Sequence, residues 1–190
     1  MRPDMMEILR KGCTILKDNN ISAPRLEAEM LMAHILECER HDLYLARDWE
    51  LDEAQKQRYF ALVEKRASGY PIQYIINRRE FMGLEFFVDR RVLIPRADTE
   101  ILVEHVIDWA SQQNRDLHIL DLGTGSGAIA VSLSVFIPQV HVTAVDISHE
   151  ALEVARYNAR LHGVHERITF LEGDLFAPLY NYPDIQLFDA

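Results

Sequence analysis

The fold is decided by the stretch Ile119-Leu120-Asp121-Leu122-Gly123-Thr124-Gly125-Ser126-Gly127-Ala128. An apolar strand here runs into a glycine-rich turn and then into a helix. The backbone of such a turn approaches a ligand closely, and the helix N-terminus presents free N–H groups at the carboxyl edge of the sheet. The stretch therefore predicts a small-molecule site. Its letters also fit the dinucleotide fingerprint G-x-G-x-x-A, so the loop alone leaves nicotinamide cofactors and S-adenosylmethionine both open.

The sequence around this loop alternates predicted strands and helices. We expect strands at 117–122, 140–145 and 168–171, helices at 128–136 and 149–161, and the start of a further strand at 186–190. Helices of this length between strands indicate βαβ units and a parallel sheet. The fold class is therefore α/β, with a doubly wound Rossmann-like domain in this half of the chain.

The residues ahead of this domain predict a different organisation. Apolar residues recur at helical spacing through the first seventy positions, and Asp52 with Gln55 forms an N-cap pair that begins a helix. Aromatic and β-branched residues from about Glu80 to Pro95 predict a β-hairpin. We expect a helical bundle at 1–70, a hairpin linker at 71–96 and the α/β domain at 97–190.

Composition and charge exclude several classes of protein. Hydrophobic residues make up 48% of the 190 residues and charged residues 26%, which is typical of a folded globular chain. The apolar runs are too short to span a bilayer, and the N-terminus lacks the apolar core of a secretory signal, so we expect a cytoplasmic protein. Cys13 and Cys38 have no disulfide or metal spacing, and we expect both to be buried.

The net charge of −10 argues against broad attraction to nucleic acid. Residues 56–96 depart from it, because nine Lys and Arg residues face four acids there. Solvated faces of a helix and a hairpin explain this segment, and a partner-facing basic belt is the alternative. His162 and His165 have H-x-x-H spacing without the further ligands of a recognised metal site, so we expect no metal.

Acidic residues follow the strands where a ligand would lie. Asp121 would repel a pyrophosphate and favour a cationic ligand. The alternative is that its carboxylate caps the loop's own N–H groups, which is compatible with either ligand. Asp146 ends the second strand, where a carboxylate accepts hydrogen bonds from a ribose diol. The alternative role of Asp146 is a helix N-cap, for which Ser148 is better placed. Asp174 follows the third strand, and Leu175 beside it could cover an adenine face. The candidate cofactor-binding residues are Gly123, Thr124, Gly125, Ser126, Gly127, Asp146, Asp174 and Leu175.

The helical N-terminal region and four later segments together resemble the HemK/PrmC family of peptide chain release factor glutamine methyltransferases. The segments are Gly69-Tyr70-Pro71-Ile72-Gln73-Tyr74-Ile75, Glu80-Phe81, Val92-Leu93-Ile94-Pro95-Arg96-Ala97-Asp98-Thr99-Glu100, and the glycine loop with Asp121. The segment that begins at Val92 is the most specific, since the loop alone indicates only a class I methyltransferase. Two positions depart from the family pattern: Asn77 stands where glycine is common, and Ala97 where proline is common. Both departures concern local turn geometry.

The resemblance implies an S-adenosyl-L-methionine-dependent enzyme with a helical substrate-recognition domain. Its substrate would be the glutamine side-chain amide in the Gly-Gly-Gln motif of bacterial or organellar release factors. In the family an Asn-Pro-Pro-Tyr loop after the fourth strand holds that amide for in-line attack on the methyl group. The chain stops before that loop, so we expect no catalytic residue within it and an incomplete sheet. We also expect poor solubility, weak or no donor binding and no methyl transfer from residues 1–190 alone.

Three other functions remain open at this stage. A nucleic-acid amino methyltransferase would use the same donor, although the acidic net charge counts against it. A non-catalytic S-adenosylmethionine-binding module is a second alternative, and an NAD-dependent oxidoreductase, which Asp121 disfavours, is a third. For partners we expect release factors, no membrane and no direct nucleic acid, with the protein acting as a monomer in translation termination.

Overall fold

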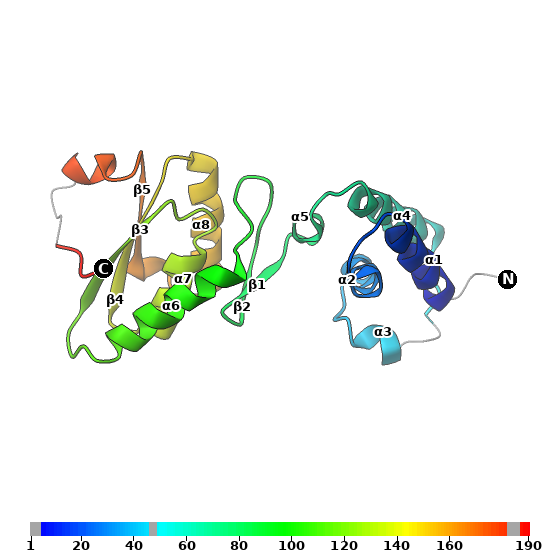
Figure 1. The fold of residues 1–190 in the computed structure, drawn as a ribbon, viewed down its shortest axis with the longest axis horizontal. Helices are drawn as coiled ribbons and strands as arrows, with labels where there is room; N and C mark the ends of the chain where they lie inside the picture. Colours follow the sequence, from blue (N-terminus) through cyan, green and yellow to red (C-terminus); the bar gives the residue numbers. More distant parts are fainter. Residues whose placement is uncertain (1–4, 46–48, 182–186) are drawn as a thin grey trace. The chain divides into compact units, whose positions relative to one another are not determined.

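The computed structural model describes residues 5–45, 49–181 and 187–190. The chain forms two compact units, Met1–Ile76 and Asn77–Ala190 (Figure 1). The first is helical, and the second contains the strands together with further helices. The α/β class with an N-terminal helical region is confirmed. The finer division at residues 70 and 96 stays a prediction.

The first unit is a small bundle of helices around one apolar core. Its helices are α1 (Met5–Asp18), α2 (Pro24–Leu36), α3 (Asp42–Leu45), α4 (Glu53–Ala67) and α5 (Ile72–Ile76). The predicted N-cap is confirmed, because Asp52 accepts a hydrogen bond from Gln55 N at 2.7 Å while the Gln55 side chain accepts from Asp52 N at 3.0 Å. This reciprocal pair satisfies two backbone donors that a helix start otherwise leaves free.

The core of the bundle includes Leu16, Leu31, Met32 and Tyr59, all fully buried. The expectation that Cys13 and Cys38 are buried is wrong, since both thiols are only partly covered. Both are packed against the apolar core of the bundle.

The second unit begins with a short antiparallel hairpin, β1 (Arg79–Phe81) and β2 (Leu84–Phe86). The predicted hairpin extended to Pro95, but the strands end at Phe86. Asn77, where the family commonly has glycine, adopts the left-handed φ of 54° that asparagine tolerates better than most residues. Its side chain donates to Val88 O at 3.1 Å, and its own carbonyl accepts from Val88 N. The asparagine therefore keeps the turn that glycine would make.

A three-stranded parallel sheet forms the centre of the second unit. Its strands are β3 (Leu117–Leu122), β4 (Val140–Asp146) and β5 (Ile168–Glu172), and they lie side by side in the order β3-β4-β5 (Figure 1). Register pairs Asp121 with Ala144, and Asp146 with Glu172. The carboxyl ends of all three strands consequently meet at one edge, which is where parallel sheets bind ligands.

Three helices accompany this sheet: α6 (Ala97–Ala110), α7 (Ala128–Phe136) and α8 (His149–Leu161). They contact one another in series, α6 with α7 and α7 with α8, so they form one layer. The bounds predicted for α7, α8 and β3 agree with the structure. Two short 3₁₀ turns, η1 (His165–Arg167) and η2 (Ala177–Asn181), flank β5.

The predicted strand at the end of the chain is found only in part. Gln186 lies outside the described residues, and residues 187–190 are not a regular strand. They nevertheless follow β3, because Asp189 N donates to His118 O at 2.7 Å and Leu120 N donates to Ala190 O at 2.9 Å. Arg115 fixes this segment through an ion pair with Asp189 at 2.6 Å. Among the described residues, no helix has the length and apolar character needed to cross a bilayer.

Candidate functional site

The glycine loop joins β3 to α7 at the carboxyl edge of the sheet. Gly123, Gly125 and Gly127 all adopt positive φ angles, of 77°, 55° and 79°, which favour glycine. Two backbone donors, Gly123 N and Thr124 N, bond to Val145 O of the neighbouring strand at 2.8 and 2.9 Å. The loop is thereby folded back over the end of β4.

The outer side of this loop is open. A Cβ atom added at Gly123 would meet no heavy atom within 4 Å, and one added at Gly125 would meet only Gly123 O, at 4.0 Å. Gly127 differs, because a Cβ there would lie 3.1 Å from the Ala155 Cβ. The first two glycines therefore leave room for a ligand, whereas the third allows α7 to pack against α8.

Asp146 at the end of β4 holds the loop through its carboxylate. Its Oδ2 accepts from Gly125 N at 2.8 Å, and its Oδ1 accepts from Ser148 N at 2.9 Å. Ser148 itself is the N-cap of α8, as predicted, since its hydroxyl accepts from Ala151 N at 3.2 Å. Each carboxylate oxygen has capacity for a further hydrogen bond. Asp146 can thus position the loop and also accept from ligand hydroxyls.

Asn158, which the sequence analysis missed, connects the loop to the segment after the hairpin. This fully buried side chain donates to Ser126 O at 2.9 Å and to Phe87 O at 3.0 Å, and it accepts from Phe87 N at 2.9 Å. The signal in the sequence is a polar residue on the apolar face of a predicted helix, beside Ala155 and Ala159. Such a residue needs internal hydrogen-bond partners.

Asp121 is buried directly beneath the loop. Its Oδ2 accepts from the Thr124 hydroxyl at 2.7 Å. Burial raises the pKa of the Asp121 carboxyl; the Thr124 and Ala130 hydrogen bonds oppose this rise, and the nearby Asp146 charge adds to it. Asp121 therefore bonds to the loop through the Thr124 hydroxyl, whereas the alternative interpretation had the carboxylate cap the loop's N–H groups. Two neighbouring carboxylates still disfavour a pyrophosphate and favour a cation at this edge.

The raised pKa of the Asp121 carboxyl implies that the stability of the fold depends on pH. The folded-state pKa of Asp121 lies above its ordinary value of 3.8. The protonated carboxyl therefore contributes to the free energy of unfolding below pH 3.8, and this contribution is lost as the pH rises through the folded-state pKa. Asp121→Asn keeps an acceptor for Thr124 and removes the buried charge. We expect urea unfolding at pH 7 to show a more stable variant, with an advantage over wild type that shrinks towards pH 4 (about the ordinary carboxyl pKa).

The exposed carboxylate of Asp116 provides the control for this comparison. Asp116→Asn should leave the stability difference from wild type nearly independent of pH. An Asp121→Asn protein that is less stable than wild type by the same amount at both pH values would contradict a raised pKa for the buried Asp121 carboxyl.

Asp174 and Leu175 follow β5 on the segment beside Asp146. Gly173 N donates to Asp146 O at 3.0 Å, which brings the start of this segment against the end of β4. Asp174 is exposed, and Leu175 is 57% exposed with a left-handed φ of 47°. An apolar side chain held outward at the sheet edge suits a planar ligand face. The structure thus places all eight predicted residues along one edge of the sheet.

The two histidines with H-x-x-H spacing have other partners. A ring nitrogen of His162 lies 2.7 Å from Glu85 O, and His165 lies 2.8 Å from the Glu166 carboxylate. Within the described ranges, no three His, Cys, Asp or Glu side chains gather in a group that could hold a metal ion.

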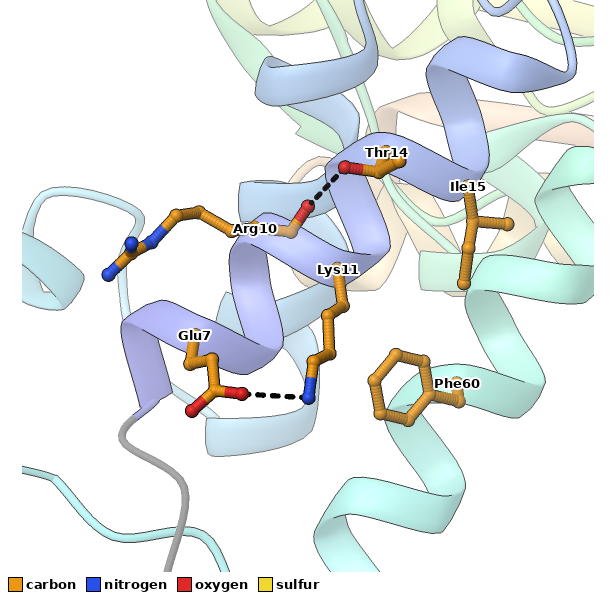
Figure 2. A pocket seen from close by; sticks show the side chains of 6 residues that line it. All are labelled: Glu7, Arg10, Lys11, Thr14, Ile15 and Phe60. Carbon is orange, nitrogen blue, oxygen red and sulfur yellow. Dashed lines mark hydrogen bonds and ion pairs between the residues drawn. The ribbon is translucent and has the colours of Figure 1, made fainter.

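The helical unit has an open hollow of about 540 Å³ between α1 and α4, shown in Figure 2. Ile15 and Phe60 give it an apolar wall. Lys11 also lines it and pairs with Glu7 at 2.8 Å, and this hydrogen bond lowers the pKa of the Glu7 carboxyl. The Thr14 hydroxyl is turned back to Arg10 O at 3.0 Å. The polar groups at the hollow are therefore largely engaged with one another.

Four of the nine basic residues of the segment 56–96 are paired with acids of their own units. Lys56 is buried and bonds to Glu53 at 2.6 Å, Arg66 pairs with Glu27, and Arg78 pairs with Glu85. Arg91 pairs with Asp89 at 2.8 Å. These contacts neutralise part of the excess charge, and the partner-facing belt stays a prediction.

Comparison with known proteins identifies both units. Residues 7–76 match the PrmC N-terminal domain, and residues 113–190 match a methyltransferase domain. The release factor glutamine methyltransferase of Chlorobaculum tepidum is 42% identical over 174 residues, which cover 90% of this chain and 59% of that protein. The enzyme of the same name from Moorella thermoacetica is 44% identical, and the match covers 92% of this chain and 62% of that protein. The enzyme of Rhodopirellula baltica is 39% identical, and the match covers 98% of this chain and 63% of that protein.

The second unit is therefore similar to a methyltransferase domain, and the helical unit ahead of it is similar to the PrmC N-terminal domain. The chain is related to the HemK/PrmC family of release factor glutamine methyltransferases, and the predicted resemblance is confirmed. It spans 59% to 63% of the length of these three relatives.

Proposed function

We propose that the second unit binds S-adenosyl-L-methionine along the carboxyl edge of its sheet, for methylation of the Gly-Gly-Gln glutamine of peptide chain release factors. The observation that carries this proposal is the identity of 39% to 44% to release factor glutamine methyltransferases across both units. The glycine loop and the carboxylates of the sheet edge support it independently. The donor supplies a methyl group already activated by a sulfonium, so the protein has mainly to bind and orient.

The residues of the edge fit this donor. Open space at Gly123 and Gly125 admits the ligand against the backbone. Asp146 has free acceptor capacity beyond its two backbone bonds, which suits a ribose diol. The exposed Leu175 offers an apolar surface to an adenine ring. Asp121 and Asp146 bring negative charge to a ligand that carries an ammonium and a sulfonium.

The acceptor side of the reaction rests on the family alone. The relatives' printed names give release factors as their substrates. We therefore propose a release factor as the partner, bound by a cytoplasmic monomer, with the helical unit contributing to its recognition. The acidic net charge supports a protein partner over a nucleic acid.

A substitution at Asp146 tests the donor site. Asp146→Ala removes a charged acceptor from the ligand and two backbone bonds from the loop. We expect calorimetry to show S-adenosylmethionine affinity about 10- to 150-fold lower, since hydrogen bonds to charged groups contribute about 1.5–3 kcal/mol. Glu172→Ala removes a carboxylate from the paired position of β5 and should leave affinity nearly unchanged. Unchanged affinity in Asp146→Ala would move the ribose acceptor elsewhere.

The activity is tested by mass spectrometry of a release factor. The full-length gene product is incubated with S-adenosylmethionine and a release factor, and the peptide that contains Gly-Gly-Gln is then examined. We expect this peptide to gain the mass of one methyl substitution, located on the glutamine. A release factor with that glutamine changed to alanine should gain nothing. An unmodified wild-type peptide, under conditions where the donor binds, would refute the proposed substrate.

A further inference from the structure

A second hollow, of about 590 Å³, lies along the exposed face of α8 in the second unit. Its walls come from α8 and from the segment that follows β2. It shares no lining residue with the candidate donor site. Its size is in the range of small-molecule sites in proteins.

Two arginines give one end of this hollow an uncompensated positive charge. Arg156 and Arg160 lie four residues apart on α8, and so share one face of the helix. Arg156 lies 5.4 Å from the centre of the Phe170 ring, and neither arginine forms an ion pair with any residue that the structure describes. Arg91, at the opposite wall, is instead paired with Asp89 and Glu153. Unpaired guanidinium groups bind phosphate or carboxylate through paired N–H donors.

Aromatic rings form the middle of the hollow. Tyr157 is 52% exposed, and its ring meets Phe87 edge to face with a centroid distance of 5.2 Å. The Phe87 contact holds the Tyr157 ring while leaving much of its surface in solvent. An exposed aromatic ring beside arginines is the combination on which nucleobases stack.

The other end of the hollow carries acceptors. Glu153 and His149 lie one and two turns nearer the start of α8, and a ring nitrogen of His149 is 2.9 Å from the Glu172 carboxylate. These groups suit the hydroxyl and amino donors of a nucleoside. A ligand with a carboxylate at this end would be repelled by Glu153. From residue 149 to residue 160 the helix advances roughly 16 Å, enough for a nucleotide.

We propose that this hollow binds a nucleoside phosphate, with the phosphate on Arg156 and Arg160 and the base on Tyr157. The ligand is a free nucleotide or one unit of a single-stranded RNA, since both present the same chemistry. The proposal does not depend on the methyltransferase reaction, because the hollow shares no lining residue with the candidate donor site.

The test uses the full-length gene product saturated with S-adenosylhomocysteine, so that the donor site cannot take up adenosine 5′-monophosphate. Binding of this nucleotide and of a five-nucleotide RNA is measured by calorimetry at low and high salt. We expect the double variant Arg156→Gln, Arg160→Gln to bind at least about tenfold more weakly. The matched control, Arg10→Gln with Arg58→Gln in the helical unit, removes the same charge and should bind normally.

A second pair of variants tests the aromatic ring. Tyr157→Phe should keep nucleotide affinity, whereas Tyr157→Ala should lower it about fivefold or more, because stacking on the ring is lost. Thermal unfolding of each variant separates loss of binding from loss of folding.

Nucleotide binding that falls in the arginine variant and in Tyr157→Ala supports the proposal. Equal binding of the mononucleotide and the RNA then identifies a free nucleotide as sufficient, whereas binding of the RNA alone identifies a nucleic acid unit. Absence of binding of both the mononucleotide and the RNA at millimolar concentration overturns the proposal, and so does binding seen only when S-adenosylhomocysteine is left out. Binding of an oligoglutamate peptide with the same variant dependence also overturns it, because the hollow would then be a site for acidic peptides.

Discussion

Asn158→Ala should lower the free energy of unfolding by about 3 kcal/mol, since buried polar groups left without partners cost about 1–3 kcal/mol each. The side chain is fully buried and makes three hydrogen bonds, two with Phe87 and one with Ser126 O. Alanine would leave a small cavity and three unpartnered backbone groups. Because Ser126 belongs to the glycine loop, affinity for S-adenosylmethionine should fall together with stability.

Urea unfolding of the full-length gene product measures the first effect and calorimetry the second. Gln112→Ala, at an exposed position of the same unit, is the control and should stay within about 0.5 kcal/mol of wild type. Asn158→Asp keeps the size of the side chain but turns the amide donor into an acceptor facing two carbonyl oxygens. It should therefore also be destabilised at neutral pH. Wild-type stability in both Asn158 variants would show that this residue does not hold the loop.

Gly127→Ala should lower the free energy of unfolding by a similar amount, because the backbone there is left-handed and α8 packs closely against it. The residue has a φ of 79°, and its added Cβ would lie 3.1 Å from the Ala155 Cβ and 3.2 Å from the Ala155 Cα. A left-handed conformation costs an L-residue about 1–2 kcal/mol, and overpacking costs about 1–3 kcal/mol more. We expect a total loss of roughly 2–5 kcal/mol in unfolding free energy.

Gly163→Ala separates the two causes. Gly163 has a similar φ of 69°, but nothing lies within 4 Å of its added Cβ. The control should therefore lose only about 1–2 kcal/mol, the backbone part of the penalty. If both variants lost the same stability, the contact between α7 and α8 at Gly127 would not be tight, and the loop would not depend on that packing.

Secondary structure around the loop was predictable because local pattern and tertiary environment agree there. Apolar residues dominate β3, glycines end the strand, and Ser148 caps α8, so the predicted bounds of these elements match. The hairpin was predicted too long for the opposite reason. Val88 and Val92 are buried by neighbouring elements without pairing in a strand. A β-branched run indicates burial, and a single sequence does not show which contact provides it.

The candidate site was predictable only in its outline. The glycines and Asp146 stand at fixed places relative to a strand, and sequence spacing shows that. Asn158 reaches the loop across 32 residues, and no local pattern gives such a contact. Asp121 was open to two interpretations, and the Thr124 hydroxyl three residues later is the feature that explains its contact with the loop.

The central claim is that the loop and the carboxylates beside it bind S-adenosylmethionine and not a dinucleotide. Its most direct test is calorimetric titration of the full-length gene product with S-adenosylmethionine and, separately, with NAD. We predict one saturable site for S-adenosylmethionine, weakened in Asp146→Ala, and no binding of NAD that competes with S-adenosylmethionine. Saturable binding of NAD with no binding of S-adenosylmethionine would contradict the claim.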